Sequence, residues 1–117
     1  MMRGGGMTAG AVQSLIAANQ PVVTQSVPIS GATVTAATDS KDATYWLKPA
    51  GTLATLTFAF PSDANSRPGQ IIRIGSTKVI TLLTLNGAAS ILNGVTAMAI
   101  NDLFSFQKVD TDTWALI

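Results

Sequence analysis

Aspartate is the only acidic side chain in this 117-residue chain, so acid–base or metal chemistry would depend on it. The sequence contains six aspartates and no glutamate, histidine or cysteine. Without histidine the commonest general base and metal ligand is missing, and without cysteine there are no thiolate nucleophiles, thiolate metal sites or disulfides. We therefore expect no enzymatic activity, no catalytic residue and no cofactor.

One pair of aspartates has a spacing that occurs in calcium loops. Asp110 and Asp112 lie two residues apart, but the further oxygen ligands and the bidentate glutamate of such a loop are absent. A solvated polar turn from Asp110 to Thr113 is the favoured interpretation. The sequence thus predicts no metal site, with calcium the one ion left open. Asp39 and Asp42, which flank Lys41, also indicate a polar loop.

The composition points to a protein that hides apolar surface against a partner. Charged residues make up 11% of the chain, against about a quarter in an ordinary soluble domain. Hydrophobic residues make up 47%, and a chain of this length buries only roughly two-thirds of its unfolded surface. The apolar surface left over predicts a homo-oligomer. The basic residues are scattered singly, which predicts no nucleic-acid partner, and no apolar run is long enough to predict a membrane partner.

The first 21 residues are expected to form an N-terminal arm. Ala9, Val12, Leu15 and Ile16 recur at helical spacing, and Pro21 ends the pattern. A helix of about ten residues is marginal in water, so the arm is either disordered or ordered by docking on a partner. The candidate anchoring residues are Arg3, Val12, Leu15 and Ile16. A cleaved signal peptide is disfavoured because polar residues interrupt the apolar centre, and a start at Met1, Met2 or Met7 stays open.

From residue 22 to residue 117 the pattern predicts one all-β domain. Leu56, Phe58 and Phe60 alternate on one face of a strand, and Asn86-Gly87 and Asn93-Gly94 are typical of hairpin turns. About eight short strands at even spacing favour an antiparallel β-sandwich or jelly-roll-like domain. The residues expected to supply its core are Leu56, Phe58, Phe60, Ile72, Ile74, Leu83, Phe104 and Phe106.

The aromatic residues have two interpretations. We expect core or interface roles for Trp46, Phe58, Phe60, Phe104, Phe106 and Trp114, because they lie within apolar strands. Alternatively, Tyr45, Trp46 and Trp114 form a platform on which sugars stack. The many threonines alternate with aliphatic residues and would keep a strand face wettable without charge, which suits repeated subunit contacts.

The chain from about residue 45 to its end resembles small β-modules of tailed-bacteriophage virion proteins. The stretches that carry the resemblance are Pro49–Thr57, Pro68–Ile74, Val79–Gly87, Phe104–Phe106 and Asp112–Trp114. Such modules occur in head decoration (cement) proteins, head fibres and tail-fibre tips, commonly as trimers.

The resemblance implies a structural protein of the virion. A short arm and one compact domain, without a shaft, suit a decoration protein that is made in the host cytoplasm and cements the capsid surface. Its expected partners are further copies of itself, as a homotrimer, and the major capsid protein. The alternative is a tail-fibre tip or an adhesin-like module that binds a glycan or receptor.

Overall fold

A computed structural model describes residues 22–36 and 40–117 of the chain. The predicted arm, with Arg3, Val12, Leu15 and Ile16, lies outside these residues. The described part contains nine strands and one short 3-10 helix, η1 (Asp63–Asn65). The strands are β1 (Val22–Ser26), β2 (Thr33–Thr35), β3 (Ala43–Leu47), β4 (Leu53–Ala59), β5 (Ile71–Ser76), β6 (Ile80–Asn86), β7 (Ser90–Leu92), β8 (Leu103–Asp110) and β9 (Thr113–Leu116).

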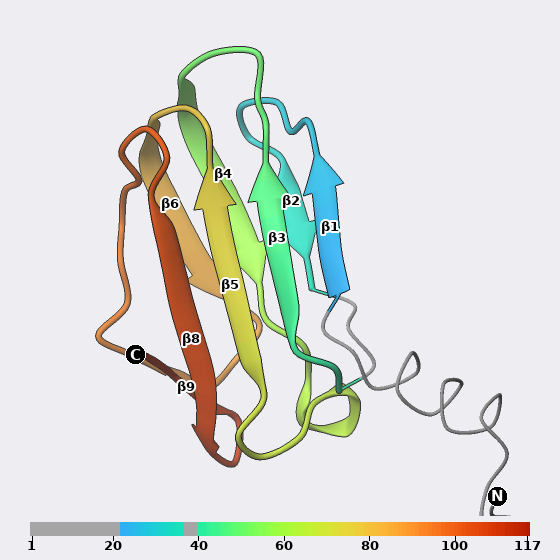
Figure 1. Cartoon of the computed structure of the whole chain (residues 1–117). Coiled ribbons are helices and arrows are strands. Elements are labelled where there is room, and N and C mark those ends of the chain that lie inside the picture. The colour runs from blue at the N-terminus through green and yellow to red at the C-terminus, as the bar shows by residue number, and fades with distance from the viewer. Residues whose placement is uncertain (1–21, 37–39) are drawn as a thin grey trace, which may run out of the picture.

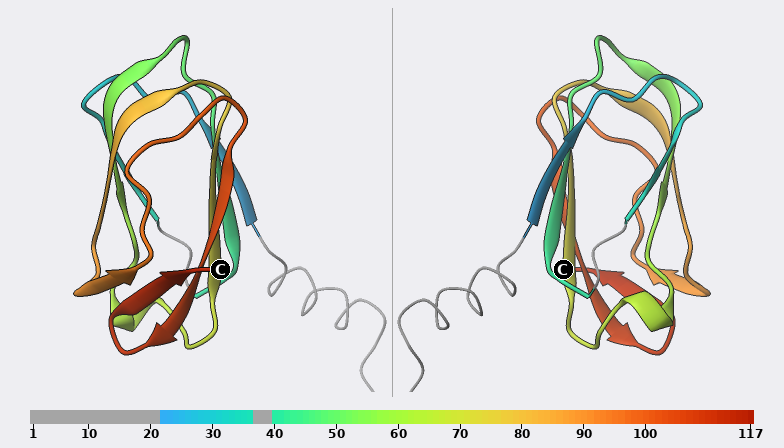
Figure 2. Two further views of the ribbon diagram at one scale, coloured as in Figure 1. Left: turned by 90° about the vertical axis from the view of Figure 1, so that its left-hand side faces the viewer. Right: turned by 90° about the vertical axis from the view of Figure 1, so that its right-hand side faces the viewer.

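The strands form two sheets that pack face to face (Figures 1 and 2). The larger sheet has six strands in the order β1-β3-β5-β8-β9-β7, and the smaller has three in the order β2-β4-β6. Apolar side chains alternate along most strands, so each sheet turns one apolar face towards the other. The core therefore lies between the two layers.

The first six strands alternate between the two sheets, and neighbours within each sheet run parallel. In the larger sheet Val22 pairs with Ala43, which pairs with Ile72 on its other side. In the smaller sheet Leu53 of β4 pairs with Ile80 of β6. The chain thus crosses from one layer to the other and returns beside its previous strand, as in a β-solenoid.

The last three strands, β7, β8 and β9, are arranged differently from the first six. β8 runs antiparallel to β5 and to β9, and β7 lies parallel to β9 at the edge of the larger sheet. β9 and β7 cross from the larger layer towards the smaller one at one end of the molecule (Figure 2). This arrangement brings Trp114 of β9, which is fully buried, between the layers.

The prediction of an all-β domain is confirmed, but the prediction of an antiparallel sandwich or jelly roll is wrong for most of the strands. Five of the seven strand pairs in the described residues are parallel. A parallel neighbour needs a long crossover connection, which is usually an α-helix. Here the crossover is a strand of the opposite sheet, so parallel pairing arises without a helix.

The two predicted Asn-Gly hairpins are also absent. Only one residue of each pair has a positive φ angle, Gly87 at 88° and Asn93 at 55°, whereas a type I′ turn requires both. The two pairs flank β7, which pairs with β9. Gly87 is held against the backbone of Phe60, where a Cβ atom would overlap the Phe60 carbonyl group. The polar turn between β8 and β9 was predicted correctly, and Asp112 adopts a φ of 47° in it.

Seven of the eight residues that were expected to supply the core are buried. Phe104 is half-buried and packs against the same cluster. An aromatic chain links the layers: Phe58 of β4 contacts Tyr45 of β3, and Phe60 contacts both Phe106 and Trp114. No helix in the described ranges is long and apolar enough to cross a membrane.

Candidate functional site

The aromatic residues singled out from the sequence divide between the core and the outer surface. Phe58, Phe60, Phe106 and Trp114 are buried between the sheets. Trp46 is half-buried on the outer side of β3, because its inward neighbours in that strand are Tyr45 and Leu47. Its indole ring covers Gly75 of β5 so closely that a Cβ atom there would overlap it.

Two of the three aromatic rings that were considered for sugar stacking are inaccessible to a ligand. Tyr45 is 5% exposed and Trp114 is fully buried, so neither ring presents a face to a ligand. Trp46 remains accessible beside Leu103, which is 51% exposed. A single half-buried indole makes a much smaller platform than the one that the sequence suggested.

A buried lysine joins η1 to the end of β8. Lys108 Nζ lies 2.7 Å from Asp63 Oδ1 and 2.8 Å from Ser66 Oγ. The same carboxylate oxygen accepts a hydrogen bond of 2.8 Å from the backbone N–H of Asp112. Asp63 and Lys108 border a hollow of about 290 Å³, which Pro68, Asp110 and Thr111 also line.

The pairing of Asp63 with Lys108 limits the chemistry that is available in this hollow. The hydrogen bond from Lys108, together with that from the Asp112 backbone, lowers the pKa of the Asp63 carboxyl below its ordinary value of 3.8. A carboxylate with a lowered pKa is a poor general base near neutral pH. We therefore interpret these groups as a structural contact that holds η1 and Ser66 against β8.

One of the two aspartates considered for calcium makes a local hydrogen bond with its carboxylate. Asp110 Oδ1 accepts a hydrogen bond of 2.7 Å from the backbone N–H of Thr111, as in an ordinary polar turn. Within residues 22–36 and 40–117, no three acidic, histidine or cysteine side chains gather in a way that could hold a metal ion.

A second polar network fixes the loop between β4 and β5 to the start of β3. Asp42 Oδ1 accepts hydrogen bonds of 2.9 Å from Arg67 Nη2 and from the backbone N–H of Ile71. Gln70 is fully buried, and its Nε2 donates to the carbonyl oxygen of Lys41 at 2.6 Å. Like the lysine pair, this network holds the loops at one end in place.

The smaller sheet presents a surface of a different kind. None of its three strands contains a charged residue. Thr33 of β2 pairs with Thr57 of β4, which pairs with Thr84 of β6, so three threonines lie in one row across the outer face. Leu82, which is 50% exposed, lies two residues before Thr84 in β6 and therefore on the same face.

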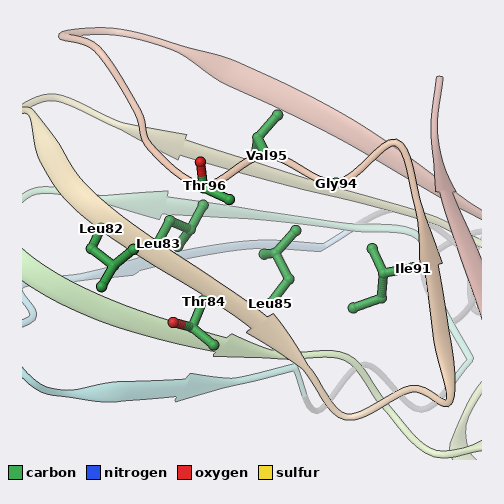
Figure 3. Close-up of a pocket in the computed structure, with 8 residues that line it drawn as sticks. All are labelled: Leu82, Leu83, Thr84, Leu85, Ile91, Gly94, Val95 and Thr96. Carbon is green, nitrogen blue, oxygen red and sulfur yellow. The ribbon is translucent and has the colours of Figure 1, made fainter.

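A groove of about 450 Å³ runs beside β6 at the edge of this face. Figure 3 shows Leu85 and Ile91 approaching each other across it, with Gly94, Val95 and Thr96 forming the opposite wall. Its lining consists of aliphatic side chains, two threonines and a glycine. The uncharged face and this groove form one continuous surface, which we call the β6 surface.

Sequence reasoning missed two features of these sites. Lys108 was treated as one of several scattered cations, although it follows Phe104 and Phe106 at a spacing of two and so shares their inward face. The threonine row could not be read from the sequence, because it depends on the parallel register of β2, β4 and β6.

Comparison with known proteins adds no assignment: no protein-family model, no curated protein and no solved structure matches the chain.

Proposed function

We propose that this protein is a structural subunit of a bacteriophage virion, which decorates and cements the capsid as a homo-oligomer. The proposal rests on the resemblance of residues 45–117 to β-modules of virion proteins. The trimeric state and the location on the capsid surface come from that resemblance. Further copies of the chain and the major capsid protein are the proposed partners.

The observation that carries the proposal is the uncharged, partly apolar surface that the fold leaves exposed. Leu82 is 50% exposed on a sheet face without charges, and an apolar groove adjoins it. Large exposed apolar patches in soluble proteins mark sites of association. The described residues contain no histidine, cysteine or glutamate to support a catalytic interpretation. An assembly role therefore fits this surface better than an enzymatic role.

In this proposal the N-terminal arm supplies the attachment to the capsid. Val12, Leu15 and Ile16 would enter an apolar groove of the capsid protein, with Arg3 near acidic groups. Ordering the arm costs roughly 1–2 kcal/mol per residue in backbone entropy, so a single arm would bind weakly. Several arms in one oligomer offset this cost, because each bound arm raises the local concentration of the next.

The test is cosedimentation of the purified chain with undecorated capsids of the phage that encodes it. We expect the full chain to bind, and a chain lacking residues 1–20 to bind at least about tenfold more weakly, because the apolar contacts are lost. Leu15→Asp should weaken binding, whereas Gln13→Asp, off the apolar stripe, is the matched control. Absence of binding by the full chain would refute the decoration function. Equal binding by the truncated chain would refute only the role of the arm.

The alternative function is that of a tail-fibre tip or adhesin-like module. The burial of Tyr45 and Trp114 weakens the argument for a glycan platform. If the full chain cosediments with phage tails and not with capsids, this alternative replaces the decoration function.

A further inference from the structure

The β6 surface has the properties of a contact between identical chains. The outward residues of β2 and β4 are mainly threonine and alanine, and those of β6 add Leu82. β-Branched side chains on a pleated face are stiff and pack closely without loss of much rotamer freedom. The charged residues of the described part lie on the larger sheet, in η1, or in loops and turns.

The absence of charge argues for a second copy as the occupant. A basic or acidic partner would gain nothing from a face that carries no opposite charge, and selective recognition of such a partner usually depends on complementary charges. Two copies of an uncharged face can meet without like-charge repulsion. The exposed Leu82 is then removed from water by the same contact.

The groove extends the contact beyond the sheet. Ile80 and Met98 exchange two backbone hydrogen bonds, of 2.9 and 3.0 Å, and the N–H of Leu83 donates to the carbonyl oxygen of Thr96 at 2.8 Å. Beyond Leu83, no further backbone hydrogen bond in the described residues joins the segment after β7 to β6. The two segments diverge there, and the space between Leu85 and Ile91 opens as the groove (Figure 3).

The area of the sheet face also indicates how much surface a stable contact must include. β4 and β6 have seven residues each and β2 has three. With strands about 4.8 Å apart and about 3.3 Å per residue, the sheet face covers about 270 Å². A stable protein–protein contact usually buries about 800 Å² on each partner. The sheet face alone is too small, so a stable contact has to include the groove as well.

We infer that the β6 surface is where one copy of this chain contacts the next in the homo-oligomer. The inference rests on the proposed function, because it names the surface through which that oligomer forms. Leu82 enters the contact from the face, and the apolar groove at Leu85 and Ile91 receives side chains of the neighbouring copy.

The chain offers a closely matched pair of variants for the test. Leu82→Glu places a carboxylate on the outer face of the smaller sheet. Leu103→Glu places one on the outer face of the larger sheet, and these leucines are 50% and 51% exposed. Thr57→Glu in β4 and Thr44→Glu in β3 form a second pair, since both threonines are half-buried and face outwards. Circular dichroism and thermal unfolding check that each full-length variant is folded.

Native mass spectrometry and sedimentation equilibrium measure the outcome. We expect the wild-type chain and the Leu103→Glu and Thr44→Glu variants to associate alike. Leu82→Glu and Thr57→Glu should raise the dissociation constant at least about tenfold, because a carboxylate is brought into an uncharged contact. A monomeric wild-type chain would refute the homo-oligomer of the proposed function and this inference with it. An oligomer that survives both β6-surface variants, or that Leu103→Glu alone dissociates, would refute this inference and leave the proposed function standing.

Discussion

Lys108 and Asp63 form an ion pair whose two members differ in burial. The lysine side chain is 6% exposed, whereas that of the aspartate is 43% exposed. A buried ammonium group without its partner is costly, while an exposed carboxylate without its partner is readily solvated. Loss of the ion pair therefore costs more at the lysine than at the aspartate. Substitutions of the two residues should change the free energy of unfolding by different amounts.

The first prediction concerns the pH dependence of this pair. The folded chain holds the pKa of Asp63 below 3.8, chiefly through the hydrogen bond from Lys108. The unfolded chain therefore binds the proton more readily, so the pair stabilises the fold above pH 3.8 and this contribution is lost as the pH falls through the lower folded pKa. Asp63→Asn should lower the free energy of unfolding near neutral pH, with a difference from wild type that shrinks below pH 3.8.

Urea unfolding from about pH 7 to about pH 2.5 measures this difference. Lys108→Met is the complementary variant, because an apolar side chain of similar length removes the buried charge together with the need for a partner. It should destabilise less than Asp63→Asn. A difference between wild type and Asp63→Asn that stays constant over the whole pH range would contradict the prediction.

The second prediction separates two costs at glycines with positive φ. Gly31 and Gly87 have φ angles of 83° and 88°, but only Gly87 lies against other backbone, that of Phe60. Gly31→Ala should cost about 1–2 kcal/mol from the left-handed conformation alone. Gly87→Ala should cost at least about 1 kcal/mol more, because the methyl group overlaps the Phe60 carbonyl. Equal free energies of unfolding for the two variants would show that this close approach is unimportant.

The third prediction concerns the aromatic contact between the layers. Phe58 is fully buried, and its ring centroid lies 5.3 Å from those of Tyr45 and Phe60. Phe58→Ala should lower the free energy of unfolding by about 3–5 kcal/mol, through lost burial and the cavity that remains. Val109→Ala, at a position 51% exposed on β8, should stay within about 0.5 kcal/mol of wild type. A loss below about 1 kcal/mol for Phe58→Ala would argue against a tightly packed core.

The sequence predicted which residues face inwards much better than which strands are neighbours. The alternation of Leu56, Phe58 and Phe60 was enough to identify their buried face, because side-chain direction along a strand is a local property. Parallel and antiparallel strands have the same alternation, so it could not predict the pairing direction. That direction depends on connections which cross to the opposite sheet.

In the candidate sites too, the sequence indicated local features but not contacts between residues far apart in the chain. The Asn-Gly pair indicated a change of chain direction at Gly87, but the contact of Gly87 with Phe60 joins residues in different parts of the chain. The row formed by Thr33, Thr57 and Thr84 likewise depends on register across three strands. The single-residue preferences could be read from the sequence, whereas these distant neighbours could not.

The parallel pairing of the first six strands also affects how quickly the chain can fold. Twenty residues lie between Val22 and Ala43, and more lie between Leu53 and Ile80, so each of these parallel pairs must close a long loop before it gains any contact. Among the strands that the structure describes, β8 and β9 are the only neighbouring pair that a tight turn joins and that can therefore pair locally. Folds dominated by distant contacts reach the native state in milliseconds to seconds, on the order seen for other all-β domains, and stopped-flow refolding should give rates in that range. During synthesis, β1 has to wait for β3, whereas β5 cannot gain its second neighbour until β8 has been made, so part of the apolar strand surface stays unpaired until β8 has left the ribosome.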